Sequence, residues 1–90
     1  MTASDPLAPL RARFIQRAIV DGEALNEALE ANAMDRVEPL VHGLAGSAGV
    51  FGFTEVSSAA IAIDTVFGRG ETPPADQVHD LIALIRRTYS

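Results

Sequence analysis

The sequence contains no cysteine, no tryptophan and no lysine, and its aromatic residues are one tyrosine and four phenylalanines. Without cysteine the chain can form neither a disulfide nor a thiolate metal site, and it has no cysteine nucleophile. The absence of cysteine also fits a reducing compartment, and we predict a cytoplasmic protein. With so few aromatic side chains, the core is expected to be aliphatic and rich in alanine, as in helical bundles.

Long apolar runs and clustered positive charge are also missing. No apolar run approaches the ~20 residues that span a bilayer, and the first residues lack a secretory signal pattern, so we expect no contact with a membrane. The formal net charge is −5, and all seven basic side chains are arginines. Because a nucleic-acid surface needs a clustered basic face, this charge pattern argues against nucleic acid and favours protein partners.

The length and the apolar content of the chain suit one small helical domain. Ninety residues, of which 48% are hydrophobic, are predicted to form a single domain over residues 1–90. Apolar residues recur at helical spacing in four segments, which predicts helices over roughly 6–32, 35–51, 54–68 and 74–89. Helices joined by short turns pack as antiparallel neighbours. The predicted fold is therefore all-α, an antiparallel up-and-down four-helix bundle, and the predicted state is a monomer.

Local signals mark where these helices begin. Asp5 before Pro6, then Asp35 and Thr54, are the expected N-caps of the first three helices. The pair Asp21 and Gly22 interrupts the helical pattern of the first segment and could mark either a kink or a true break. We favour one long helix. The apolar stripe of that helix consists of Leu7, Leu10, Phe14, Ala18, Leu25, Ala28 and Leu29.

The most informative segment is His42, followed by Gly43, Gly46 and Gly49, within the second predicted helix. Each glycine costs ~1 kcal/mol relative to alanine in a helix interior, so roughly 2–3 kcal/mol of helix stability is lost over one segment. Helical side chains lean toward the helix N-terminus, so Ala45 and Gly46 would cover the surface beside His42. Both are small, which leaves the imidazole uncovered. The other side of the helix carries an apolar stripe formed by Val37, Leu40, Val41, Leu44, Ala48 and Phe51.

The segment from His42 to Asp64 resembles the histidine-containing phosphotransfer (HPt) family of bacterial phosphorelays. The family pattern is a histidine, an apolar residue two positions later, Gly-Ser-Ala-Gly, a further glycine, and an alanine with an apolar-acidic pair on the next helix. This chain supplies these residues as His42, Leu44, Gly46, Ser47, Ala48, Gly49, Gly52, Ala60, Ile63 and Asp64. One position departs from the family, because the usual lysine one helical turn after the histidine is Ala45 here.

The resemblance implies that His42 is the phospho-acceptor of a phosphorelay intermediate. It would take a phosphoryl group from a receiver-domain aspartate or from a sensor or hybrid histidine kinase, and pass it to a response regulator. Imidazole titrates near neutrality and offers a nitrogen lone pair, so it can accept the group without an activating base. Gly46 is expected to give the partner access, and Asp64 to orient the ring.

The same resemblance implies little chemistry beyond the histidine. No cofactor and no metal are expected on this chain, and the receiver domain of the partner is expected to bring Mg²⁺. No autonomous kinase or hydrolase activity is expected, because the motifs assemble no nucleophile, base and orienting group. His79 lies among charged residues and is expected to be solvated.

Two questions stay open at the level of sequence. Apolar residues beside the core stripe are candidates for partner docking, although those of the first helix suit the core equally well. They are Ile15, Ile19, Val20, Gly49 and Val50. The alanine at position 45 also leaves an alternative function, a non-phosphorylated adaptor bundle that binds receiver domains. A helical acyl carrier is a weaker alternative, because the sequence lacks an Asp-Ser-Leu attachment site.

Overall fold

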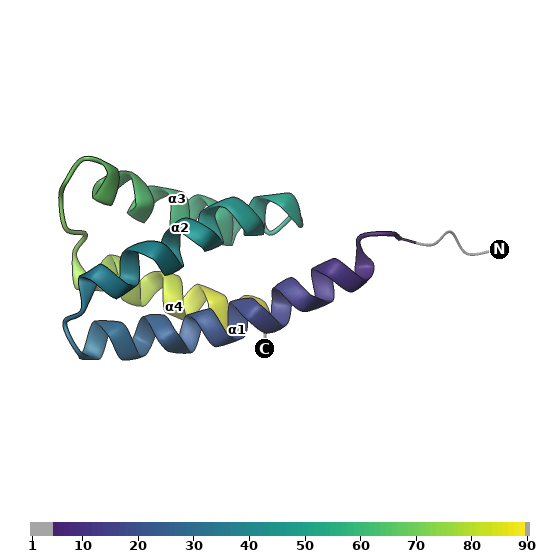
Figure 1. Cartoon of the computed structure of the whole chain (residues 1–90), viewed down its shortest axis with the longest axis horizontal. Helices are drawn as coiled ribbons and strands as arrows, with labels where there is room; N and C mark the ends of the chain where they lie inside the picture. The colour runs from purple at the N-terminus through teal and green to yellow at the C-terminus, as the bar shows by residue number, and fades with distance from the viewer. Residues whose placement is uncertain (1–4, 90) are drawn as a thin grey trace.

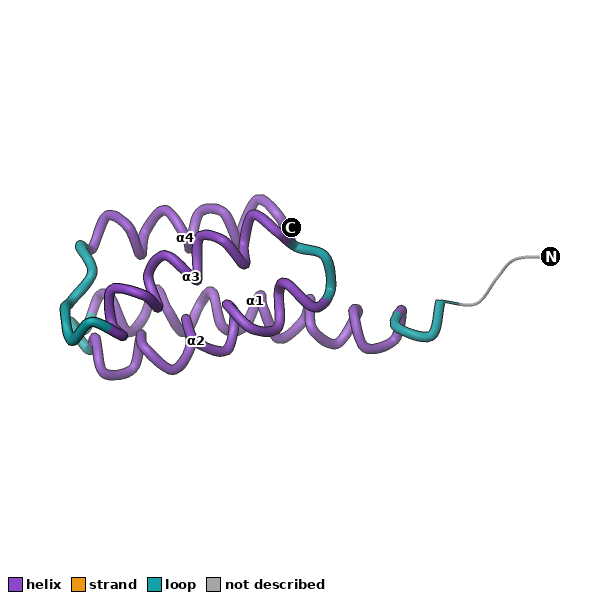
Figure 2. Tube along the Cα trace, turned by 90° about the horizontal axis from the view of Figure 1, so that it is seen from above, coloured by secondary structure: helices purple, strands orange, loops and turns teal. Residues whose placement is uncertain are grey.

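The structure, a computed structural model, describes residues 5–89 as four antiparallel helices (Figure 1). These are α1 (Ala8–Glu30), α2 (Met34–Val50), α3 (Thr54–Gly68) and α4 (Ala75–Tyr89). Residues 1–4 and 90, which the predicted domain includes, lie outside the described part of the chain. The connecting loops lie at alternate ends of the bundle (Figure 2), and no strand occurs among residues 5–89. The predicted all-α up-and-down bundle is therefore confirmed.

Each helix packs against two neighbours, so the four helices enclose one core. α1 contacts α2 and α4, and α3 contacts the same two helices. The largest fully buried side chains are aliphatic, as expected from the scarcity of aromatic residues: Leu25, Leu44, Ile63, Leu81, Ile82, Ile85, Val37, Val41, Val56 and Val78. Burying one such side chain stabilises the fold by about 1.5–3 kcal/mol. Among residues 5–89, none of the helices combines the length and apolar character that a bilayer span requires.

The first turns of α1 project beyond the rest of the bundle (Figure 1). Leu7 and Leu10 are consequently exposed, although their spacing predicted that they would join the core stripe. Helical spacing identifies the face on which a residue lies, but it does not show whether a neighbouring helix reaches that far. Phe14 is the first residue of the predicted stripe that is buried, and its ring lies 5.3 Å from that of Phe51.

The predicted N-caps are wrong for three helices. The carboxylate of Asp5 accepts the Leu7 N–H at 2.9 Å and binds Arg11 at 2.8 Å, so it holds a turn that precedes α1. The Arg11 hydrogen bond, followed by that of the Leu7 N–H, lowers the pKa of Asp5 below its ordinary value. Asp35 lies inside the first turn of α2, and Thr54 is the first residue of α3.

The observed caps of α2 and α3 are Ala33 and Phe53, which make no side-chain capping bond. Both are partly buried against the core. These two helices therefore begin where an apolar side chain packs on the core, rather than where a polar side chain could cap the backbone. Asp35 still lies where its negative charge favours the N-terminus of the helix dipole.

α1 continues through Gly22 without a break, as favoured from the sequence. Gly22 is buried, and a Cβ placed on it would lie 2.9 Å from Cγ2 of Ile85 in α4. This separation is too short for a real Cβ contact. The glycine therefore permits a close approach of α1 and α4 and leaves the helix intact.

The turn between α2 and α3 determines how the two helices face one another. Gly52 has a φ of +84°, a left-handed conformation that glycine adopts without steric cost. The N–H of Phe53 donates to the carbonyl of Ala48 at 2.9 Å, and the N–H of Gly52 donates to the carbonyl of Gly49 at 3.2 Å. This is a Schellman motif, which ends α2 and directs the chain into α3.

Candidate functional site

His42 lies near the middle of α2, on the face turned away from the core. The buried residues of α2 are Val37, Val41, Leu44 and Ala48, at helical spacing. The side chain of His42 is 77% exposed. The apolar stripe thus anchors one side of the helix, and the other side presents the imidazole to solvent.

The surface beside the imidazole is open because the neighbouring residues are small. A Cβ built on Gly43 or on Gly46 would meet no atom within 4 Å outside its own helix backbone and chain neighbours. Ala45 is half-buried against the core and contributes only a methyl group. A second protein can therefore approach the ring without displacing a side chain at these three positions.

Asp64 in α3 holds one nitrogen of the imidazole ring. The Nδ1 atom of His42 lies 3.1 Å from Oδ2 and 3.2 Å from Oδ1 of Asp64, whose side chain is 30% exposed. An ionised carboxylate can only accept a hydrogen bond, so this contact favours the tautomer with its proton on Nδ1. In the neutral ring the other nitrogen, Nε2, then carries the free lone pair.

A second contact, between Ser57 and Ala45, joins α2 and α3. Ser57 is buried in α3, and its hydroxyl donates to the carbonyl of Ala45 at 3.1 Å. A Cβ on Gly49 would lie 3.1 Å from Oγ of Ser57, which is tighter than most real contacts. Gly49, predicted as a docking residue, thus also gives Ser57 room to reach α2. Ser57 was not predicted from the sequence, although it precedes Ala60 by three residues on the core-facing side of the helix.

A groove between α1 and α2 reaches Gly43, the residue that follows His42. It is lined by Phe14, Arg17, Asp21, Gly43, Leu44 and Ser47. Nε of Arg17 lies 3.0 Å from Oδ1 of Asp21, one helical turn further along α1. Neither residue was predicted from the sequence, where both belong to the polar face of a helix and carry no distinguishing motif.

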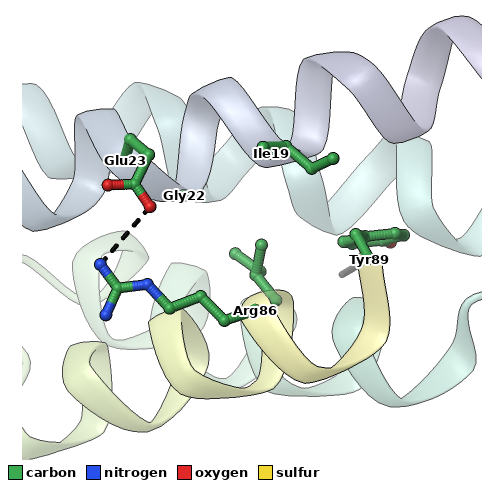
Figure 3. Close-up of a pocket in the computed structure, with 6 residues that line it drawn as sticks. Ile19, Gly22, Glu23, Arg86 and Tyr89 are labelled. Carbon is green, nitrogen blue, oxygen red and sulfur yellow. Dashed lines mark hydrogen bonds and ion pairs between the residues drawn. The ribbon is translucent and has the colours of Figure 1, made fainter.

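The remaining predicted docking residues differ in exposure and in the helices that they border. Val20 and Val50 are exposed, and Ile15 is partly buried against the core. Ile19 lines a pocket between α1 and α4 with Gly22, Ile85 and Tyr89 (Figure 3). Ile19 therefore borders α4 rather than α2, so the structure does not bring all of the predicted docking residues together in one patch.

The described residues contain no group of three or more histidine, cysteine or acidic side chains that could hold a metal ion. His79 is exposed on α4, a helix that does not carry the His42 site. The arrangement around His42 instead suits a nucleophile. It combines an accessible lone pair, a carboxylate on the opposite ring nitrogen and a surface without obstruction.

Comparison with known protein families matches residues 9–88 to the Hpt domain. The match extends over nearly all of the four helices. No curated protein and no solved structure matches the chain.

Proposed function

The chain belongs to the Hpt domain family, which performs histidine phosphotransfer in two-component signalling, and from this premise we propose that it is a phosphorelay intermediate. His42 accepts a phosphoryl group from a receiver-domain aspartate or a sensor kinase and passes it to a response regulator. The observation that carries the proposal is the contact between Nδ1 of His42 and Asp64 at 3.1 Å, which leaves Nε2 free toward solvent.

In the proposed reaction Nε2 attacks the phosphorus atom of an aspartyl phosphate on the partner. A bond forms between Nε2 and phosphorus, and the bond between phosphorus and the carboxylate oxygen breaks, with its electron pair leaving on that oxygen. The ring gains positive charge as its lone pair is shared, and the carboxylate of Asp64 stabilises the proton that remains on Nδ1. Transfer to the next receiver is the reverse of these steps.

Phosphoryl transfer depends mainly on in-line positioning and on neutralisation of charge. The bundle holds the nucleophile on a rigid helix, which supports positioning, while Gly46 leaves room for the partner. We propose that this chain binds no cofactor itself and that Mg²⁺ is held by the receiver domain of the partner. We further propose that it acts as a cytoplasmic monomer and that exposed Val20 and Val50 contribute to docking.

Transfer from a phosphorylated receiver tests the proposal. Receivers from the same genome are charged with acetyl phosphate and incubated with the chain, with His42→Ala and His79→Ala as the two matched variants. We expect an acid-labile, base-stable phosphoramidate on the wild type and on His79→Ala, and none on His42→Ala. Equal phosphorylation of His42→Ala would refute the assignment. Binding of receivers without any phosphorylation would instead support the adaptor function that Ala45 leaves open.

A further inference from the structure

A cation would stabilise a phosphoryl group on His42, and the arginine of its own helix, Arg36, precedes His42 by six residues. A phosphoryl group at neutral pH carries a charge of about −1.5 to −2, and it is stabilised by a positively charged hydrogen-bond donor. The sequence has no lysine, and Ala45 stands one turn after His42. Any cation that this chain contributes to the phosphorylated state is therefore an arginine. Arg36 lies about 9 Å from His42 along the helix axis, so we expect the arginine on a neighbouring helix.

Arg17 is the arginine that lines the groove between α1 and α2. It lies in α1 and shares this groove with Gly43, which follows His42 directly, and with Ser47. Its side chain is 74% exposed, and within residues 5–89 its one ion-pair partner is Asp21. Arg86, in contrast, pairs with Glu23 across the pocket between α1 and α4 (Figure 3).

Gly43 and Gly46 add no side chain between the groove that Arg17 lines and the face of α2 that carries the imidazole. Gly43 and Gly46 lie on this part of α2, and a Cβ at either position would stand in open space. Packed helices have axes only 8–10 Å apart, and arginine has a long flexible stem. A rotation of the Arg17 side chain over the glycines would bring its guanidinium to the phosphoryl oxygens on Nε2.

We propose that Arg17 exchanges Asp21 for the phosphoryl group on His42 and so provides the charge compensation that the missing lysine would otherwise supply. This inference rests on the proposed function of His42. The exchange is favourable because the Arg17 side chain is 74% exposed and a single hydrogen bond joins it to Asp21, which is 15% exposed; a pair one turn apart on a helix contributes little. A guanidinium binds phosphoryl oxygens through two parallel hydrogen bonds, and these are stronger. Asp21 keeps Arg17 beside the groove until the phosphoryl group arrives.

The test uses chemical phosphorylation, so it requires no partner protein. Phosphoramidate donates its phosphoryl group to an exposed imidazole and releases ammonia. The wild type, Arg17→Ala, Arg17→Lys and Arg86→Ala are treated in this way, and Arg86→Ala is the control because it removes the same charge on the α4 side. NMR then follows the arginine Nε–H signals and the ³¹P signal of the phosphohistidine.

We expect the Nε–H signal of Arg17, and not that of Arg86, to shift on phosphorylation. Arg17→Ala should raise the second pKa of the phosphoryl group, because a neighbouring cation favours the dianion, while Arg86→Ala should leave it unchanged. The phosphohistidine should hydrolyse about tenfold faster in Arg17→Ala, because the guanidinium no longer withdraws electron density from the phosphoryl oxygens. Arg17→Lys should restore part of both properties.

A second substitution distinguishes charge compensation from a structural effect. Ala45→Lys places the family's lysine beside the histidine, and in the Arg17→Ala background it should return the lifetime of the phosphohistidine to near the wild-type value. An unshifted Arg17 signal, with equal lifetimes for the wild type and Arg17→Ala, would overturn the inference and leave the function of His42 intact. A chain that accepts phosphate from phosphoramidate but from no receiver would instead contradict the proposed function alone.

Discussion

The Nδ1 atom of His42 in α2 lies 3.1 Å from Oδ2 of Asp64 in α3, although 22 residues separate the two in the chain. The Schellman turn at Gly52 reverses the chain between them and so aligns the two helices. Because an ionised carboxylate can only accept, the pair favours the proton on Nδ1 and leaves the lone pair on Nε2.

The first prediction concerns this pair. Asp64→Asn replaces an obligatory acceptor with an amide that can also donate, so the preference for the Nδ1–H tautomer should weaken. We expect ¹⁵N NMR to show an increased fraction of the Nε2–H tautomer and phosphoryl transfer to slow by about tenfold. Asp80→Asn, which removes an exposed carboxylate from α4, serves as the control. A wild-type tautomer ratio together with a wild-type rate in Asp64→Asn would exclude the orienting role.

The second prediction concerns access to the imidazole. Gly46→Leu should leave the fold unchanged, since a Cβ at this position meets open space. The larger side chain should nevertheless keep the partner from the in-line position, and a displacement of about 1 Å can slow such a reaction ~10²-fold. Rapid-quench transfer from a phosphorylated receiver measures the rate, and circular dichroism checks the fold. Transfer at the wild-type rate would show that Gly46 does not control access.

The third prediction compares two helical glycines. Gly46→Ala should raise the free energy of unfolding by about 0.5–1 kcal/mol, because alanine has the higher helix propensity and no neighbour obstructs it. Gly22→Ala should lower it by about 1–2 kcal/mol, because the added methyl group meets Cγ2 of Ile85 at 2.9 Å, and this contact outweighs the same gain in propensity. Urea unfolding of both variants measures the difference. A gain in stability for Gly22→Ala would contradict the close packing of α1 on α4.

The fourth prediction concerns Tyr89, which is buried at the aromatic end of the bundle. Its ring packs on Phe53 at 4.9 Å, and its hydroxyl has no hydrogen-bond partner among the described residues. Burial raises the pKa of Tyr89 to about 12. Between pH 10 and 12 the unfolded chain therefore binds fewer protons at this residue than the folded chain, so stability falls as the pH rises through this range.

Tyr89→Phe should remove the contribution of Tyr89 to the fall in stability between pH 10 and 12. At neutral pH the variant should be as stable as the wild type or more stable, since it deletes a buried polar atom without a partner. Denaturant unfolding at a series of pH values between 8 and 12 gives both results. An alkaline slope in the variant equal to that of the wild type would show that other groups cause the loss.

Helical spacing in the sequence was sufficient to predict the four helices and the buried stripe of α2. It also predicted the exposure of His42, because the side chains that could cover an imidazole on a helix are its neighbours three and four positions later. It failed at Leu7 and Leu10, whose burial depends on how far the other helices extend. It failed also at the N-caps, where the packing of Ala33 and Phe53 prevailed over local polar signals.

The sequence by itself pointed to His42 as the candidate nucleophile and predicted that its surroundings are small, since both depend on one helix. Only the tertiary structure decided what lies across from that helix. It places Asp64 on Nδ1, Arg17 beside Gly43, and Ser57 against Gly49. The physical reason is that these contacts join separate helices, and their distances depend on the packing of the whole core rather than on spacing along the chain.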